Sequence, residues 1–164
     1  MKASAFQPVE VFRILARHDV RYVLIGGLAA TLHGSPLTTG DVDICPSTDR
    51  SNLERLAAAL NEMRARIHSD REPDGVAFIA DAAFLERAEV WNLTTQFGRL
   101  DVSYRPSGTQ GYEDLQRDAV GFELDDVQVE TASLADVIRS KEAAGRERDR
   151  QALPTLRRLL ERLG

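Results

Sequence analysis

Disulfide bonds and long apolar runs are missing from this chain of 164 residues. Its single cysteine, Cys45, excludes an internal disulfide framework and a zinc site built from several cysteines. No apolar run approaches the roughly 20 residues that a membrane-spanning helix needs. Residues 1–8 also lack the apolar stretch of a signal peptide. We therefore expect a cytoplasmic protein that has no membrane partner.

Internal repeats, low-complexity tracts and a convincing linker are also missing. Hydrophobic residues make up 43% of the chain and charged residues 29%, proportions that are typical of a globular protein and not of a disordered tail. The length suffices for one domain with a core and is short for two. We predict a single domain over residues 1–164. Its core spans about residues 8–131, and a C-terminal helical segment spans about residues 133–164.

Positive charge is scarce in the chain as a whole, and it is concentrated near the C-terminus. The net charge is −5, which alone argues against nucleic-acid binding. Residues 139–162, however, contain eight basic and four acidic side chains, a net charge of +4 that leaves −9 for the remainder. A basic segment on an acidic body indicates a polyanionic partner. A solvated helix face explains the same charges, and the sequence leaves both explanations open.

The apolar pattern switches between helical spacing and strand-like runs. It predicts helices at residues 8–17, 28–33, 51–65, 81–88 and 112–119, from 134 onward after a cap at Ser133, and at about 148–163. Strand-like runs lie at 21–25, 41–45, 89–95, 99–104, 122–124 and 127–131, the last four forming two hairpins. This order predicts an α+β, or mixed α/β, fold in which helices flank a central mixed sheet.

A pair of acids, Asp41 and Asp43, lies on one of these strands. Because side chains alternate along a strand, both carboxylates point to one face, where they repel each other unless a cation neutralises them. Mg²⁺ binds such carboxylates together with substrate phosphates, and paired ions support in-line phosphoryl displacement. Asp101 lies in a second apolar strand and completes a three-carboxylate cluster if the two strands are neighbours. An exposed strand face also produces two such acids by chance.

An apolar strand followed by Gly26-Gly27 and a short helix precedes the acid pair. Unobstructed backbone N–H groups at the start of a helix are a natural anion site. A short connection would let a triphosphate meet the metal there. An ordinary strand-to-helix turn is the alternative, since glycine is a normal choice at such turns.

These residues carry a resemblance. Gly26-Gly27, thirteen residues and then Asp41-Val42-Asp43 resemble the G-S/G-G…D-x-D signature of the DNA polymerase β-like nucleotidyltransferase superfamily. The fuller string YVLIGGLAA from residue 22, with HG at 33 and TTGDVDI from 38, resembles the AbiEii/MenT-type nucleotidyltransferases of bacterial toxin–antitoxin systems. The tail SLADVIRSKEAAGRERD from residue 133 is similar to the helical K…R..D block of that family. The resemblance covers about residues 20–155 and implies a nucleotidyltransferase fold.

The resemblance implies a role for each matching residue. Its metal ligands are Asp41 and Asp43, with Asp101 as the third carboxylate, and its nucleotide-binding and supporting residues are Gly26, Gly27, Thr39, Lys141, Arg146 and Asp149. Lys141 would contact the triphosphate, Arg146 a second phosphate, and Asp149 would support the site. The serine of the G-S signature, which helps to hold a phosphate, is replaced in this chain by Gly27. Backbone N–H groups, Thr38 or Thr39 would have to take over its role.

The function that the resemblance implies is transfer of a nucleoside monophosphate from an NTP to a hydroxyl, with Mg²⁺ or Mn²⁺ as the metal. The acceptor would be the 3′ end of tRNA, so that translation is blocked, and a small antitoxin protein would be the partner. Phosphorylation of Thr39, two residues before Asp41, would place a dianion beside the metal ligands and compete with the triphosphate. A protein or small-molecule acceptor, or an inactive binding module of the same fold, are the alternatives.

Overall fold

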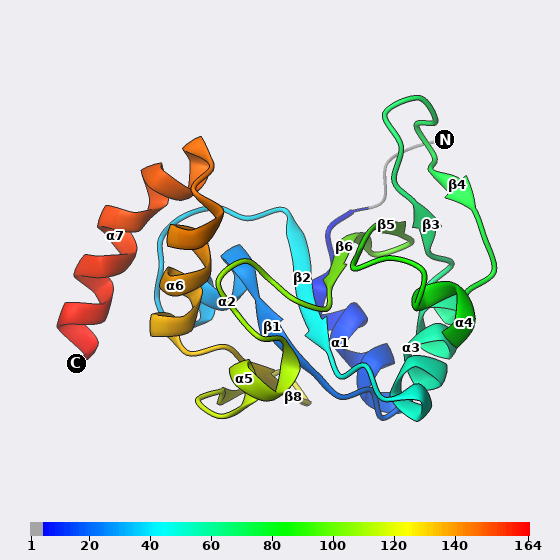
Figure 1. Cartoon of the computed structure of the whole chain (residues 1–164), viewed down its shortest axis with the longest axis horizontal. Helices are drawn as coiled ribbons and strands as arrows, with labels where there is room; N and C mark the ends of the chain where they lie inside the picture. Colours follow the sequence, from blue (N-terminus) through cyan, green and yellow to red (C-terminus); the bar gives the residue numbers. More distant parts are fainter. Residues whose placement is uncertain (1–4) are drawn as a thin grey trace.

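The structure, a computed structural model, describes residues 5–164 and contains one eight-stranded sheet. The strands follow the order β4-β3-β5-β6-β2-β1-β8-β7, and Figure 1 shows their arrangement. Their bounds are β1 Tyr22–Ile25, β2 Asp41–Pro46, β3 Arg66–Ile67, β4 Val76–Ala77, β5 Val90–Thr95, β6 Gly98–Ser103, β7 Val120–Leu124 and β8 Val127–Thr131. The β1–β8 and β2–β6 pairs are parallel and the others antiparallel, so the predicted mixed sheet is confirmed.

Helices lie on both sides of this sheet. They are α1 Pro8–Arg17, α2 Gly26–Leu32, α3 Arg50–Glu62, α4 Ala82–Leu85, α5 Tyr112–Gln116, α6 Leu134–Ala144 and α7 Glu147–Leu163. In Figure 1, α2, α6 and α7 lie to one side of the central strands, and α1, α3 and α4 to the other. Among residues 5–164, no helix combines the length and the apolar character that crossing a membrane requires.

The core explains why the two acids of β2 point where they do. Val42 and Ile44 are fully buried, together with Phe12 of α1 and Leu56 of α3. Side chains alternate along a strand, so burial of Val42 and Ile44 directs Asp41 and Asp43 to the opposite face of the sheet. The hydrophobic effect therefore fixes the orientation of the polar pair.

Several boundaries differ from the sequence-based expectation. α2 begins at Gly26 and not near residue 28, so both glycines belong to its first turn. β3 and β4 were not expected, because two-residue strands leave no alternation to detect. α7 continues through Pro154, which lies inside the helix. The expected cap at Ser133 forms: its hydroxyl accepts from the Asp136 N–H, and the Asp136 carboxylate pairs with Arg139.

Candidate functional site

Three carboxylates meet on the sheet face that carries α2, α6 and α7. β2 and β6 are parallel neighbours, and their register sets Asp43 opposite Asp101 and Asp41 opposite Arg99. One oxygen from each of Asp41, Asp43 and Asp101 lies within 4.8 Å of the others. All three residues are half-buried. The pairing of β6 with β2 thus brings Asp101 next to Asp41 and Asp43. The sequence around Asp101 did not show whether these two strands are neighbours.

Burial and mutual repulsion make this cluster costly without a cation. Burial, followed by the nearby charges of Asp41 and Asp101, raises the pKa of Asp43 to about 7. Burial also raises the pKa of Asp101, although the Arg99 guanidinium opposes this change. Carboxylates with raised pKa values at the floor of a cleft are typical of functional sites and of metal sites in particular.

Arg99 is a cation of the site for which sequence analysis proposed no role. Its guanidinium lies 3.1 Å from the Asp101 carboxylate, and its Nε is buried without a hydrogen-bond partner among residues 5–164. The spacing of two residues between Arg99 and Asp101 places both side chains on one strand face, so alternation alone would have indicated the pair. Arg99 thus offsets part of the negative charge on the triad.

The helical block supplies the opposite wall of the site. The Asp149 carboxylate is fully buried at the start of α7 and accepts a hydrogen bond from Arg146 Nε at 2.7 Å. Lys141 Nζ, at the end of α6, lies 3.6 Å from the same carboxylate. Burial raises the pKa of Asp149, but the hydrogen bonds and charge of Arg146 outweigh this effect and the net result is a lowered pKa. Asp149 therefore stays ionised and holds two cations at the cleft.

Arg148 is a second cation that sequence analysis missed. It lines the same cleft, and its positive charge partly opposes the raised pKa of Asp43. Arg146, to which a phosphate contact was assigned, is already bonded to Asp149 through its backbone N–H and its side chain. Gly145, in left-handed conformation with φ of 63°, ends α6 immediately before Arg146. The sequence motif contains both residues and does not distinguish them.

The two glycines pack directly against the acids and the preceding loop. Gly26 has a φ of 72°, and a Cβ at this residue would collide with the Asp43 carboxylate. A Cβ on Gly27 would lie 2.9 Å from Thr39 Oγ1. The hydroxyl of Thr39 is also 3.5 Å from an Asp41 carboxylate oxygen. The Thr39 hydroxyl therefore occupies the space that a side chain at position 27 would need.

These groups surround one cleft of about 760 Å³, within the range of ligand pockets in proteins. Its lining includes every site residue predicted from the sequence, namely Gly26, Gly27, Thr39, Asp41, Asp43, Asp101, Lys141, Arg146 and Asp149. The acids form its floor, while Lys141, Arg146 and Arg148 come from the α6–α7 wall. Residues that are more than a hundred positions apart in the sequence thus share one cleft.

The basic C-terminal segment does not form one surface at this cleft. Four of its basic residues besides Arg146 are paired with carboxylates: Arg139, Lys141, Arg150 and Arg157. Arg158 and Arg162 lie roughly 15 to 21 Å further along α7 than Arg148, at 1.5 Å per residue. The basic side chains of this segment that line the cleft are therefore Lys141, Arg146 and Arg148.

The acid triad fits a hard divalent cation. Its donors are three carboxylate oxygens close enough to share one ion. The raised pKa values of Asp43 and Asp101 agree with a site whose negative charge is only partly compensated by the protein. Mg²⁺ and Mn²⁺ favour this oxygen donor set, whereas zinc sites usually include histidine or cysteine. The side chains that would hold the ion are Asp41, Asp43 and Asp101.

The raised pKa of Asp43 predicts a pH-dependent stabilisation by Mg²⁺. An unfolded aspartate ionises near pH 4, whereas folded Asp43 keeps its proton until about pH 7, so the stability of the metal-free protein falls as pH rises through this window. Metal binding requires the ionised form. We expect the increase in melting temperature on adding MgCl₂ to be larger at about pH 8 than at about pH 6. Thermal unfolding of the wild type and of Asp43→Asn measures this, and an equal pH dependence in the variant would refute the assignment to Asp43.

Comparison with known proteins places the fold. No protein-family model and no curated protein sequence matches the chain. Among solved structures, it is similar to the lincosamide antibiotic adenylyltransferase LnuA in its lincomycin-bound form, with a TM-score of 0.61, 16% identity, and coverage of 95% of this chain and 99% of that one. It is also similar to ANT(2″)-Ia in complex with adenylyl-2″-tobramycin, with a TM-score of 0.58, 14% identity and coverage of 96% and 87%.

A third similar structure is a candidate nucleotidyltransferase from Thermotoga maritima, with a TM-score of 0.54, 16% identity, and 97% of each chain covered. At these identities the likeness is one of fold. The chain has the nucleotidyltransferase fold that its sequence predicted.

Proposed function

We propose that this protein is a metal-dependent nucleotidyltransferase that transfers a nucleoside monophosphate from an NTP to an acceptor hydroxyl. One observation carries the proposal: Asp41, Asp43 and Asp101 converge within 4.8 Å at the floor of a cleft whose facing wall holds Lys141, Arg146 and Arg148. Negative charge on one side and positive charge on the other suit a metal-bound triphosphate. The nucleotidyltransferase fold agrees with this chemistry but does not establish it.

The reaction follows from the positions of these groups. The acceptor oxygen attacks the α-phosphorus, the new O–P bond forms, and the bond from that phosphorus to the bridging oxygen breaks to release pyrophosphate. Asp101 is placed beside Asp41 and Asp43 to accept the acceptor's proton. Lys141 and the arginines of α7 offset charge developing on the pyrophosphate. Asp41, Asp43 and Asp101 would hold the divalent ion, which would supply Lewis-acid activation of the attacking hydroxyl.

Thr39 takes over the phosphate contact that Gly27 lacks in this proposal. Its hydroxyl lies 2.9 Å from the position of a Cβ on Gly27, so it fills the place of the serine in the G-S signature. We expect Thr39→Val to raise the KM for NTP about tenfold, the equivalent of one hydrogen bond to a charged group. Thr38→Val, at the exposed neighbouring residue, should change KM less than about twofold.

A pair of substitutions makes the test of Thr39 sharper. Gly27→Ser alone should impair the enzyme, because its Cβ would crowd the Thr39 hydroxyl. Combined with Thr39→Gly, the serine has room and should recover part of the lost NTP affinity. Steady-state kinetics of the two single variants and the double variant check this. Additive losses in the double variant would show that the two positions do not share one role.

RNA is the acceptor that the sequence resemblance supports. The AbiEii/MenT-like strings in the glycine turn and in the α6–α7 block imply a toxin that modifies the tRNA 3′ end and is neutralised by an antitoxin. Arg148 at the cleft mouth, and Arg158 and Arg162 further along α7, are exposed cations available to a phosphate backbone. Regulatory phosphorylation of Thr39 would belong to the same toxin proposal.

A small molecule is the second candidate acceptor. The structures of LnuA and ANT(2″)-Ia contain lincomycin and an adenylylated tobramycin, so this fold accommodates both in other proteins. The cleft of this protein has a volume of about 760 Å³. This volume is large enough for a compact small-molecule acceptor.

Labelled nucleotides distinguish these possibilities. The protein is incubated with each α-³²P NTP and Mg²⁺, together with total RNA, protein extract or small-molecule acceptors, alongside Asp41→Ala. Label on RNA that disappears in the variant supports the toxin proposal. Label on a protein or a small molecule supports the alternative. No label on any acceptor, from folded wild-type protein, would contradict the enzymatic proposal and favour an inactive binding module.

A further inference from the structure

The second half of α6 carries Lys141 but contributes little to the core. Leu134, Val137 and Ile138 in the first half of the helix are buried, whereas none of the residues from Arg139 to Ala144 is. Burial of apolar side chains is the main force that holds a helix against its neighbours. The position of Lys141 at the cleft therefore depends on other contacts of this half of α6.

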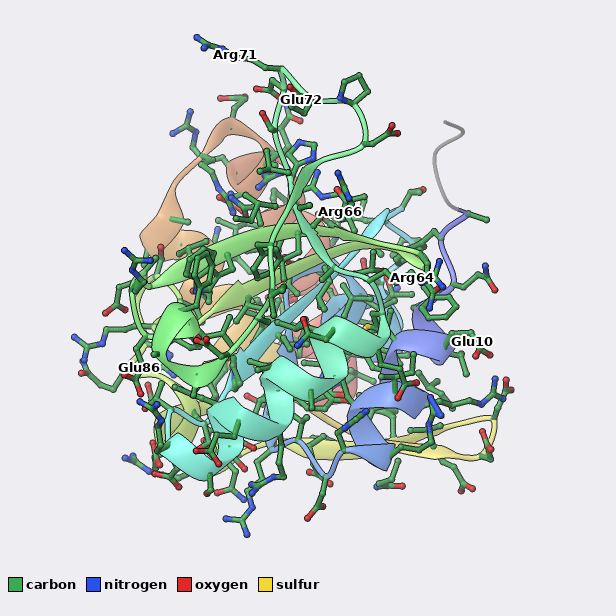
Figure 2. All side chains as sticks on the ribbon, turned by 90° about the vertical axis from the view of Figure 1, so that its right-hand side faces the viewer. Glu10, Arg64, Arg66, Arg71, Glu72 and Glu86 are labelled. Atoms are coloured by element: carbon green, nitrogen blue, oxygen red, sulfur yellow. The ribbon has the colours of Figure 1, made fainter. Side chains whose placement is uncertain are left out.

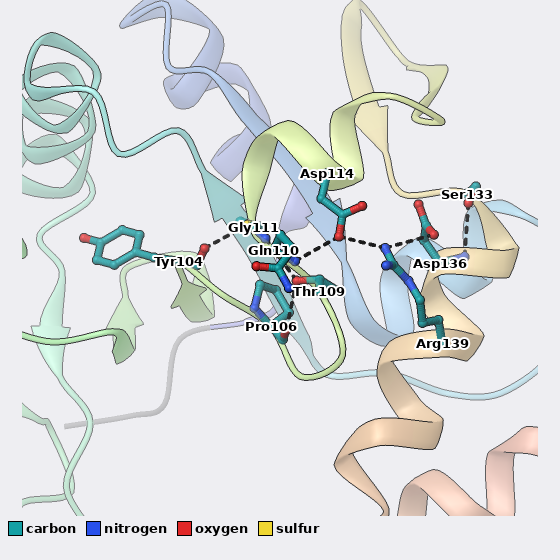
Figure 3. A network of polar contacts seen from close by, with 10 residues as sticks. Tyr104, Pro106, Thr109, Gln110, Gly111, Asp114, Ser133, Asp136 and Arg139 are labelled. Carbon is teal, nitrogen blue, oxygen red and sulfur yellow. Dashed lines mark hydrogen bonds and ion pairs between the residues drawn. The ribbon is translucent and has the colours of Figure 1, made fainter.

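Arg139 joins this half of α6 to an earlier part of the chain. Its Nη2 atom lies 3.1 Å from a carboxylate oxygen of Asp114 on α5 and 3.1 Å from one of Asp136 on α6 (Figure 3). The side chains of both acids are 13% exposed, so water screens these pairs less than it screens an ion pair at the surface. Among residues 5–164, Arg139–Asp114 is the one ion pair between α6 and the chain that precedes it.

Asp114 is itself held by the loop that precedes α5. Its carboxylate accepts a hydrogen bond from the Gln110 N–H at 2.9 Å, and this bond, followed by the Arg139 guanidinium, lowers its pKa against the effect of burial. Figure 3 shows that the loop is also bonded to itself, because the Thr109 hydroxyl donates to the Pro106 carbonyl. The loop lines the cleft with Pro106, Ser107 and Thr109. Asp114 is thus an ionised anchor on one wall of the cleft.

The same loop also packs directly against α6. Gly108 has a φ of 74°, and a Cβ at this residue would lie 2.7 Å from the Ala143 Cβ and 3.2 Å from the Arg139 carbonyl oxygen. Glycine permits this close approach because it has no side chain. The loop therefore contacts α6 at Arg139 and at Ala143, which are one turn apart and lie on either side of Lys141 in the sequence.

Lys141 projects from a different side of α6. Two residues along an α-helix correspond to a rotation of about 200°, so the side chains of Arg139 and Lys141 leave the helix in nearly opposite directions. Lys141 Nζ lies 3.6 Å from the Asp149 carboxylate of α7, and Lys141 lines the cleft. The second half of α6 is thus held by the loop on one side and by α7 on the other. Loss of the loop contact would let α6 shift and would displace Lys141 with it.

We propose that Arg139 is a positioning residue for NTP binding, which clamps α6 to the loop before α5 and so places Lys141 for contact with the triphosphate. The inference rests on the proposed nucleotidyl transfer and adds a residue that acts through Lys141 without touching the substrate. Arg139 is not among the residues that line the cleft, so an effect of its replacement on nucleotide affinity has to pass through another side chain. The effect belongs to NTP binding and not to the chemical step at the acids.

Substitutions at both ends of the ion pair test the proposal. Arg139→Gln and Asp114→Asn each remove one charge, and the asparagine oxygen still accepts from the Gln110 N–H. We expect either variant to raise the KM for NTP about five- to tenfold and to change kcat less than about twofold. Circular dichroism and thermal unfolding identify the folded variants, and Asp114→Asn decides if Arg139→Gln does not fold. An unchanged KM in a folded variant would overturn the inference.

A double-mutant cycle with Lys141 separates positioning from a general loss of structure. Lys141→Gln removes the charge but keeps a polar side chain. In that background, Arg139→Gln should raise the KM for NTP less than about twofold further, because the cation that Arg139 positions is already missing. Effects that multiply in the double variant would show that Arg139 acts independently of Lys141, and would refute its role as a positioning residue for Lys141.

Two exposed ion pairs provide the controls. Arg157→Gln removes the α7 partner of Glu142, which lies in the same half of α6. Glu86→Gln removes the partner of Arg50 on the α3–α4 surface that faces the viewer in Figure 2. Neither substitution should change the KM for NTP more than about twofold, and an effect of Arg157→Gln as large as that of Arg139→Gln would contradict the inference. Wild-type protein that neither binds an NTP with Mg²⁺ nor releases pyrophosphate would instead contradict the proposed function itself.

Discussion

Asp43→Asn is expected to reduce nucleotidyl transfer by about 10³-fold or more and, at the same time, to stabilise the metal-free protein. The loss follows because the amide removes one metal ligand from the triad. The gain follows because the folded protein raises the pKa of Asp43 to about 7, so an ionised carboxylate at about pH 8 is a cost of roughly 1–3 kcal/mol that asparagine does not carry. Pyrophosphate release and chemical denaturation without metal measure the two effects.

Opposite signs for activity and stability distinguish a functional acid from a structural one. Asp118→Asn provides the control, because Asp118 is exposed, and it should change neither quantity appreciably. Addition of Mg²⁺ should raise the stability of the wild type and have less effect on Asp43→Asn. A destabilised Asp43→Asn protein would mean that this carboxylate supports the fold and is not held there for metal binding.

Asp149→Ala is expected to lower the free energy of unfolding by about 2–3 kcal/mol and to impair NTP binding as well. The Asp149 carboxylate is fully buried and is bonded to Arg146 and Lys141, so its removal leaves two cations without their shared partner. Arg146 is more than half exposed, which places the expected loss below that of an entirely buried pair. Denaturant unfolding gives the stability, and the KM for NTP reports the displaced cations.

Glu147→Ala is the matched control for this experiment. Glu147 lies in the same first turn of α7, but its ion pair with Arg150 is exposed, and its loss should cost no more than about 0.5 kcal/mol. Equal effects of the two substitutions would show that Asp149 acts only as a charge at the helix N-terminus and does not position Lys141 and Arg146.

The parts of this molecule that follow local rules could be predicted from the sequence. Alternation along one strand placed Asp41 and Asp43 on one face, and burial of Val42 and Ile44 now explains why that face is the cleft. Helical spacing located α1, α3 and α7 to within a few residues. The mixed sheet followed from strands interspersed with helices and from the two hairpins.

The parts that depend on distant contacts could not be derived locally. Whether Asp101 joins the pair depends on β6 lying beside β2, a pairing between strands separated by more than fifty residues. Arg148 lines the cleft from α7, more than a hundred residues after Asp43, and the sequence motif does not indicate that placement.

A crystal of the protein grown or soaked with Mn²⁺ and a non-hydrolysable NTP analogue tests the central claim most directly. The anomalous signal of manganese locates the ion independently of the side chains around it. We expect a peak bound by Asp41 and Asp43, at about 2.2 Å from their oxygens, with the triphosphate directed towards Lys141. An analogue bound with its phosphates away from the α6–α7 wall, or manganese bound at another cluster, would contradict the proposal.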